Sequence, residues 1–340
     1  MRKLLGFVGI TMLAIVGGLF FAKIYVPDWA QTKVILNEPT LCKLEKGESL
    51  ATFSKHLEEK GLISSSLMFR VWIRDKGAYK HFQAGQYRFE QTVSPEDIRT
   101  ALESGKTYQP IALQFVIPEG FTIKQVIDRL EARNLATRKE LEDLAQDKTF
   151  LQQYRISGPN LEGFLFPATY TFYTMPAARE VFQQMLQKFA DSLPKDIEEK
   201  LRSHQIDLYQ AVTMASMIER ETQVDTERSY ISEVIWNRLR AGEPLGIDAA
   251  LIYGIKDYAG DIKWEHLKDP KNPYNNRLYK GLPPTPIGAI SMASLEAVFT
   301  PSHEGFRYYV LANDGSKNHR FSKTLEEHNF YVKQLLQSFR

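Results

Sequence analysis

One pattern of strand, turn and helix occurs twice in this chain and constrains its fold more than any other feature. The two copies are offset by 73 residues, which pairs Gly47 with Gly120 and Ser49 with Thr122. Each copy shows alternating apolar residues, a glycine turn, a Ser or Thr helix cap, and apolar residues at helical spacing. A looser echo follows the first copy at residues 85–98. We therefore expect two strand–turn–helix units of closely similar local structure.

An uncharged apolar run covers Leu4–Ala22, directly after two basic residues. A helix crosses the hydrocarbon layer with about 20 apolar residues, whereas the core of a signal peptide needs only about 7–15. Phe20 does not fit a signal-peptide cleavage site, so we expect a membrane anchor over residues 4–25, with a cleaved signal peptide as the alternative. The basic residues keep residues 1–3 in the cytoplasm. In a bacterium, the rest of the chain then lies in the periplasm, held at the inner membrane.

The segment after the anchor divides into three expected parts. Residues 26–39 are polar and framed by prolines, which predicts a linker. Residues 40–112 resemble a LysM-like module, a small fold associated with N-acetylglucosamine polymers. This resemblance implies glycan binding; the alternative is a spacer that holds residues 113–340 away from the membrane.

The composition excludes several classes of function. Lys and Arg number 43 and Asp and Glu 41, a formal net charge of +2, so a nucleic-acid partner is not expected. The single cysteine, Cys42, excludes an internal disulfide and a zinc site of several thiolates. The seven histidines do not fall at metal-ligand spacing. We expect neither a metal nor another cofactor.

Residues 151–340 mix helical and β patterns without strict alternation, which predicts an α+β domain. An aromatic, β-prone segment covers residues 162–173, and residues 307–322 predict a β-hairpin around an Asn-Asp-Gly-Ser turn. Asp207 and Gln210 form a capping-box pattern at the start of a helix. The next helix starts at residue 225 or 226 and ends before Gly242.

Glu219 is the strongest candidate for chemistry. It shares a small, apolar helical face with Val212, Ala215 and Ser216, so the carboxyl is expected to lose hydration and to favour its protonated form. An acid in such an apolar pocket can serve as a general acid, as one glutamate of lysozyme does. The alternative is a structural carboxylate paired with an arginine such as Arg228 or Arg238. Glu221 lies about 200° around the helix and is expected to be solvated.

Other polar residues stand among apolar ones and are candidates for substrate binding. Asn237 shares a helical face with apolar residues, where an amide needs a specific partner. Asp248 is expected first as a helix N-cap and second as a substrate contact. Tyr274 and Asn275 belong to a stiff loop rich in proline.

Several stretches, taken in order, resemble the YceG-like family of endolytic murein transglycosylases. They cover nearly everything from Leu161 onward. They are Leu161–Tyr170, Ala215–Thr222, Glu227–Arg228, Val234–Leu239, Ile252–Gly254, Pro273–Asn275, Gly281–Pro284, His319–Phe321 and Glu327–Asn329. The catalytic glutamate of the family lies in an A-S-x-I-E-x-E-T motif, which places it at Glu219; His319 joins the candidate substrate-binding residues on the same ground.

The resemblance implies an enzyme that cuts the bond between N-acetylmuramic acid and N-acetylglucosamine, leaves 1,6-anhydro ends and so terminates nascent glycan strands. Peptidoglycan strands are then the substrate, and penicillin-binding proteins or other cell-wall synthases are candidate partners. A single glutamate suffices for this reaction, because the nucleophile is the 6-hydroxyl of the sugar itself. Glycosidases of the two-carboxylate type need a second acid, and the sequence offers no obvious one.

The chain departs from the family pattern at three places. Gly246–Ala250 replaces Gln-Ser/Thr-Asp-Pro-Thr, Asn276–Arg277 replaces Thr-Tyr, and Ala289–Ser291 replaces Asn-Pro-Gly. Two other functions stay open: a lysozyme-type hydrolase, which would leave a reducing end, and a non-catalytic glycan-binding scaffold in which Glu219 is structural.

Overall fold

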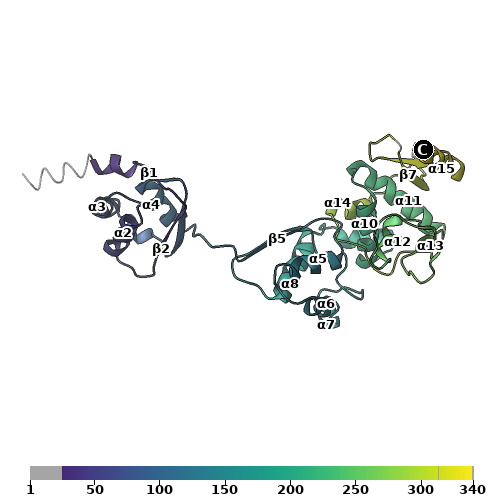
Figure 1. Ribbon diagram of the computed structural model, residues 1–340, viewed down its shortest axis with the longest axis horizontal. Coiled ribbons are helices and arrows are strands. Elements are labelled where there is room, and N and C mark those ends of the chain that lie inside the picture. Colours follow the sequence, from purple (N-terminus) through teal and green to yellow (C-terminus); the bar gives the residue numbers. More distant parts are fainter. Residues whose placement is uncertain (1–24, 313, 339–340) are drawn as a thin grey trace, which may run out of the picture. The chain divides into compact units, whose positions relative to one another are not determined.

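The computed structural model describes residues 25–312 and 314–338, which divide into two compact units with the boundary between Pro110 and Ile111 (Figure 1). The division falls two residues before the expected start of the second domain. The expected anchor at residues 4–25 lies almost wholly outside the described residues. Within the described ranges, no helix is long and apolar enough to cross a membrane.

The first unit packs short helices on small antiparallel sheets (Figure 1). A helix over residues 25–30 precedes the first strand. Two pairs of antiparallel strands form the sheets: β1 (Val34–Ile35) with β4 (Thr92–Val93), and β2 (Thr40–Leu44) with β3 (Gly85–Phe89). The helices are α2 (Leu50–Glu59), α3 (Ser66–Lys76), the 3₁₀ turn η1 (Ala78–His81) and α4 (Pro95–Ser104).

The prediction of a linker over residues 26–39 is wrong. Val26 and Ala30 are buried in the core of the first unit, and Val34 pairs with Val93 across the β1–β4 sheet. These apolar side chains remove enough surface from water to hold the segment on the unit. The polar residues between them, which suggested a linker, lie on the exposed side.

The repeat has the predicted local structure in both copies. Gly47 and Gly120 have positive φ angles of 82° and 71°, the left-handed region that favours glycine. Ser49 caps α2 and Thr122 caps α5 (Ile123–Glu131), each through a hydrogen bond from a backbone N–H three residues ahead. The strand of the first copy pairs within the first unit, whereas β5 (Leu113–Ile117) of the second copy pairs with β6 (Ala168–Phe172). The copies therefore belong to different cores.

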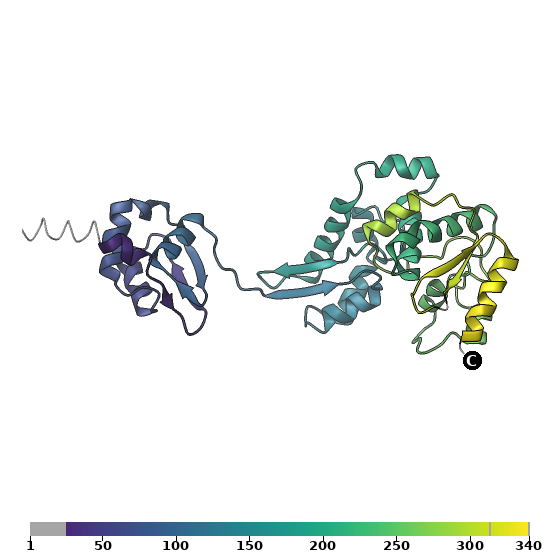
Figure 2. The ribbon, with the colours of Figure 1, turned by 90° about the horizontal axis from the view of Figure 1, so that it is seen from above.

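The second unit has the predicted mixture of helices and small sheets (Figure 2). Helices α6 to α9 follow the second copy, at Arg138–Ala145, Lys148–Gln153, Ala178–Ser192 and Ile197–His204. The remaining elements are α10 (Leu208–Glu221), η2 (Asp225–Glu227), α11 (Arg228–Arg240), α12 (Asp248–Tyr253), α13 (Trp264–Lys268), α14 (Met292–Phe299), β7 (Tyr308–Leu311), β8 (His319–Ser322) and α15 (Leu325–Ser338).

Helix α10 is the centre of the second unit. The predicted capping box is present, since the Asp207 side chain accepts from Gln210 N and the Gln210 side chain accepts from Asp207 N. The eight residues Ala211–Ile218 are all buried, against α11, α12 and α14 among others (Figure 1). A helix buried on all sides is held in one place. Its last turn is thereby fixed at the surface of the unit, where the chain reaches Glu219.

Candidate active site

A cleft of about 530 Å³ in the second unit joins three segments that are far apart in the sequence. The segments are the turn before α5, the end of α10 with the residues after it, and the β7–β8 hairpin. The lining residues are Glu119, Gly120, Phe121, Gln125, Glu219, Arg220, Glu221, Thr222, Gln223, Leu311, Lys317 and His319. Glu219 thus lines a cleft formed by all three segments.

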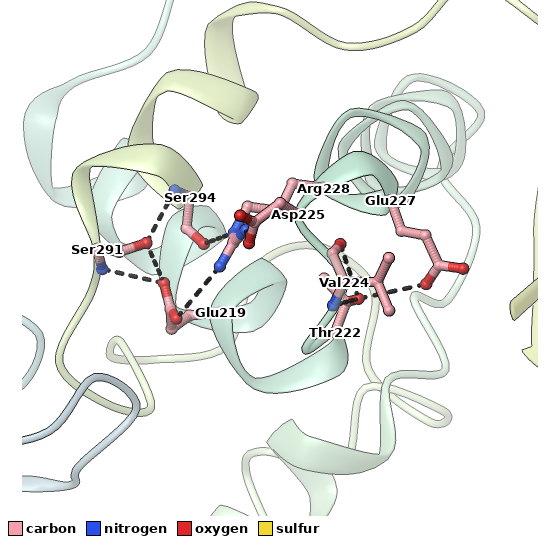
Figure 3. Close-up of polar contacts among 8 residues, drawn as sticks. All are labelled: Glu219, Thr222, Val224, Asp225, Glu227, Arg228, Ser291 and Ser294. Atoms are coloured by element: carbon pink, nitrogen blue, oxygen red, sulfur yellow. Dashed lines mark hydrogen bonds and ion pairs between the residues drawn. The ribbon is translucent and has the colours of Figure 1, made fainter. Parts of the chain in front are cut away.

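Two hydrogen bonds from Ser291 hold the Glu219 carboxylate (Figure 3). The backbone N–H of Ser291 lies 3.0 Å from Oε2 of Glu219 and its hydroxyl 2.5 Å from the same oxygen. Ser291 also caps α14 by accepting from Ser294 N at 3.1 Å. Only 6% of the Glu219 side chain is exposed. The start of α14 therefore fixes the rotamer of this acid.

The alternative role for Glu219, a structural carboxylate paired with an arginine, is met in part by Arg228. Nη2 of Arg228 lies 3.9 Å from Oε1 of Glu219, an ion-pair distance but too long for a hydrogen bond (Figure 3). The same guanidinium pairs with Asp225 and donates to Ser294 Oγ at 3.1 Å. Arg238 is not a partner, since it donates to backbone carbonyls that include Leu245 O. Among the described residues, Oε1 accepts no hydrogen bond.

The prediction that Glu221 is solvated is wrong. Its Oε2 accepts from the Tyr309 hydroxyl at 2.9 Å and its Oε1 from Ala249 N at 3.3 Å. Burial raises the pKa of Glu221, and the two hydrogen bonds oppose that rise. The side of α10 that carries Glu221 is covered by β7 and α12, which come from later in the chain. Helical position alone could not reveal this cover.

A further carboxylate of the cleft, Glu119, was missed by the sequence analysis. It precedes the turn glycine of the second repeat copy. Partial burial raises its pKa, with the nearby negative charge of Glu219 as the next cause, while Arg228 acts in the opposite direction. The glycine turn was predicted, but its place beside α10 depends on tertiary packing.

Glu162 was also missed as a buried acid. Only 1% of it is exposed, and burial raises its pKa to about 7. Its two oxygens each lie 3.0 Å from Ile123 N, at the start of α5, and Oε2 accepts from the Tyr253 hydroxyl at 2.7 Å. Glu162 thus joins α5 to α12 behind the cleft.

The sequence profile of the YceG-like family matches residues 42–334. The chain belongs to the YceG-like family. The resemblance found in the sequence is thereby confirmed, and the match covers both units.

Relatives of known name agree with the family. A Bacillus subtilis (strain 168) protein named endolytic murein transglycosylase is 27% identical over 331 residues, which cover 93% of this chain and 89% of that protein. A protein of the same name from Streptococcus pneumoniae (strain D39) is 24% identical over 328 residues, 87% of this chain but 58% of the relative. The 2.6 Å crystal structure of a yceG-like protein from Listeria monocytogenes has a TM-score of 0.60 and 27% identity, over 87% of this chain and 99% of that one.

Of the five expected substrate-binding residues in this YceG-like chain, only His319 lines the cleft of Glu219. Its Nδ1 lies 2.7 Å from Glu227 Oε2, and its backbone N–H donates to Glu227 Oε1 at 2.7 Å. Glu227 is itself buried. The imidazole is therefore held in one orientation, with its Nε2 side left for other contacts.

The other four lie elsewhere in the unit. Asn237 donates to Phe306 O at 2.8 Å. Asn275 is fully buried, and its side-chain amide donates to the backbone carbonyls of residues 266, 267 and 269. The Tyr274 hydroxyl lies 2.9 Å from Thr285 Oγ1. Asp248 is the first residue of α12, but its side chain caps nothing. It pairs instead with Arg277, one of the departures from the family pattern.

Proposed function

We propose that this YceG-like protein is an endolytic peptidoglycan lytic transglycosylase in which Glu219 is the catalytic acid and base. The observation that carries the proposal is the buried carboxylate of Glu219 in a cleft. Ser291 holds one of its oxygens, and the other accepts no hydrogen bond among the described residues. The names of the relatives support the same activity.

The two oxygens of Glu219 have different roles in this proposal. Oε2 accepts two hydrogen bonds from Ser291, so the transferable proton belongs on Oε1. Oε1 gives this proton to the oxygen that links N-acetylmuramic acid to N-acetylglucosamine, and the C1–O bond breaks. The carboxylate then takes the proton of the muramic acid 6-hydroxyl while O6 bonds to C1. The product is a 1,6-anhydro end, and no water is consumed.

The location is part of the same proposal. The apolar run at residues 4–22 would anchor the chain in the inner membrane, with both units in the periplasm, where cutting would end the growth of nascent strands. Penicillin-binding proteins or other synthases are the candidate partners there. Fractionation with protease protection tests the anchor: recovery of a shortened soluble protein that begins near Lys23 would contradict it.

The first unit would serve as a LysM-like module that adds glycan affinity or reach. The shared strand–turn–helix pattern supports this role, and a simple spacer is the alternative. Binding of the isolated residues 25–110 to insoluble peptidoglycan separates the two.

A lysozyme-type hydrolase is the second candidate, because Glu119 and Glu221 give the cleft carboxylates besides Glu219. Mass spectrometry of the products from purified peptidoglycan distinguishes these functions. Anhydro ends support the transglycosylase, reducing ends support the hydrolase, and the absence of any product supports a binding scaffold.

A further inference from the structure

The turn of the second repeat copy is held directly against α10, the helix that carries Glu219, and against the loop before α14. Gly120 N donates to Ala289 O, and Ala289 N donates to Phe121 O, both at 2.7 Å. Arg220 Nη1 donates to Gly120 O at 3.3 Å. A Cβ on Gly288 would lie 2.7 Å from that same carbonyl oxygen, so this approach requires glycine. The turn is therefore a fixed wall of the cleft.

The Glu119 side chain on this wall has no structural task. Among the described residues it makes no hydrogen bond and no ion pair, and it is open to the cleft. Its charge lies near that of Glu219, and like charges in proximity oppose folding. Glu119 is exposed, so its unpaired carboxylate is free to accept hydrogen bonds from a ligand that enters the cleft.

The first repeat copy shows that the turn itself does not need this residue. At the offset of 73, Lys46 occupies the position of Glu119, and Glu48 occupies that of Phe121. The backbone is nevertheless the same, with positive φ at both turn glycines and a capped helix after each. The chemistry at Glu119 and Phe121 is thus specific to the copy that borders the cleft.

We propose that the Glu119–Phe121 turn is a sugar-binding wall of the cleft, in which the Glu119 carboxylate accepts hydrogen bonds from hydroxyl or N–H groups of a bound glycan strand. This inference rests on the proposed function. A carboxylate accepts only, and the hydroxyl and acetamido groups of the glycan supply donors. The partly buried Phe121 ring lies beside it, with the Arg129 guanidinium 4.5 Å from the ring centroid. Glu119 is here a substrate-binding group, and the proton transfers remain with Glu219.

Binding without turnover provides the test. In full-length Glu219→Gln protein, the Kd for purified glycan strands is measured with and without Glu119→Ala. Loss of a charge-assisted hydrogen bond predicts a Kd for Glu119→Ala that is about 10- to 100-fold higher. The Kd of Glu119→Gln should lie between that of Glu119→Ala and that of the protein that keeps Glu119. Glu198→Ala, a change at an exposed glutamate of α9, is expected to leave the Kd unchanged.

Kinetics of the otherwise wild-type chain give a second readout. Glu119→Ala is expected to raise KM more than it lowers kcat, and Glu119→Asp to restore part of the loss. An unchanged Kd and KM in folded Glu119→Ala protein would overturn the inference and leave the proposed function standing. The proposed function fails separately, if the wild-type chain yields no anhydro ends.

Discussion

Ser291 donates both its backbone N–H and its hydroxyl to the same oxygen of Glu219. The same hydroxyl accepts from Ser294 N at the first turn of α14. One residue therefore caps a helix and orients the candidate acid.

Substitutions at Ser291 separate these two tasks. Ser291→Ala removes the cap, at a cost of about 1 kcal/mol of stability, and also the hydroxyl that holds Oε2. Ser291→Gly costs only a few tenths of a kcal/mol of stability, because glycine is tolerated at an N-cap, yet it removes the same hydroxyl. We expect both to lower kcat about tenfold with little change in KM, and Ser291→Thr to retain most activity. Equal kcat for all three variants would show that the hydroxyl does not orient Glu219.

Glu219→Gln is expected to abolish formation of anhydro ends, at or beyond the upper end of the about 10²–10⁴-fold loss for a general acid or base. The melting temperature should change little, because Arg228 keeps Asp225 and Ser294 as partners. Products and thermal melts are measured on one preparation, with Glu198→Gln as the control. An early-melting variant that still makes anhydro ends would refute the catalytic role.

Glu221→Ala should destabilise the protein by about 1–3 kcal/mol, since it strands the buried Tyr309 hydroxyl. Tyr309→Phe in the same chain removes the stranded group, so the double variant should lose less than the sum of the single variants. Denaturant unfolding of the four proteins measures this coupling. Strictly additive losses would mean that the Glu221–Tyr309 hydrogen bond contributes nothing.

Glu162 should make stability depend on pH. Its pKa of about 7 in the folded protein is raised above the ordinary value of 4.5, so the folded state binds more protons between these values. Its contribution is therefore full below about pH 4.5 and is lost as the pH rises through 7, by at most about 3 kcal/mol. Glu162→Gln removes this loss, so the variant should gain stability relative to wild type between pH 5 and pH 8. Unfolding free energies at both pH values check this, and a constant difference would contradict it.

The second unit should fold and act without the first. It has its own core, and β5 pairs with β6 inside it. A truncated chain of residues 111–340 is expected to melt cooperatively and to release anhydro ends from soluble glycan strands. If it folds yet releases none at any substrate concentration, the first unit is more than an accessory.

The sequence predicted what is decided locally. Ser94, Thr122 and Asp207 cap helices as expected, because a cap depends on residues three positions apart. The motif and the apolar helical face were also sufficient to single out Glu219, since both lie within one short stretch of the chain. The helix from Asp207, the helix that ends before Gly242 and the hairpin at residues 307–322 lie close to the predicted residues for the same reason.

The predictions that were wrong or missing concern contacts between segments that are distant in the sequence. Helical geometry placed Glu221 away from Glu219 but could not show that Tyr309 would cover it. Ser291 follows Glu219 by 72 residues, and its hydrogen bonds have no local signal. Val26 and Ala30 are too few to show a periodic pattern, although both are buried.

Because the cleft is assembled from distant segments, its walls are completed at different times during synthesis of the chain. Its walls come from the second repeat copy, the end of α10 and the β7–β8 hairpin, of which Leu311, Lys317 and His319 are part. A ribosome that has just finished Ser291 has already made the acid and its hydrogen-bond donor, but the hairpin wall does not yet exist. The cleft is therefore incomplete until the β7–β8 hairpin has been synthesised, and a chain that stops before residue 308 would lack one of its walls.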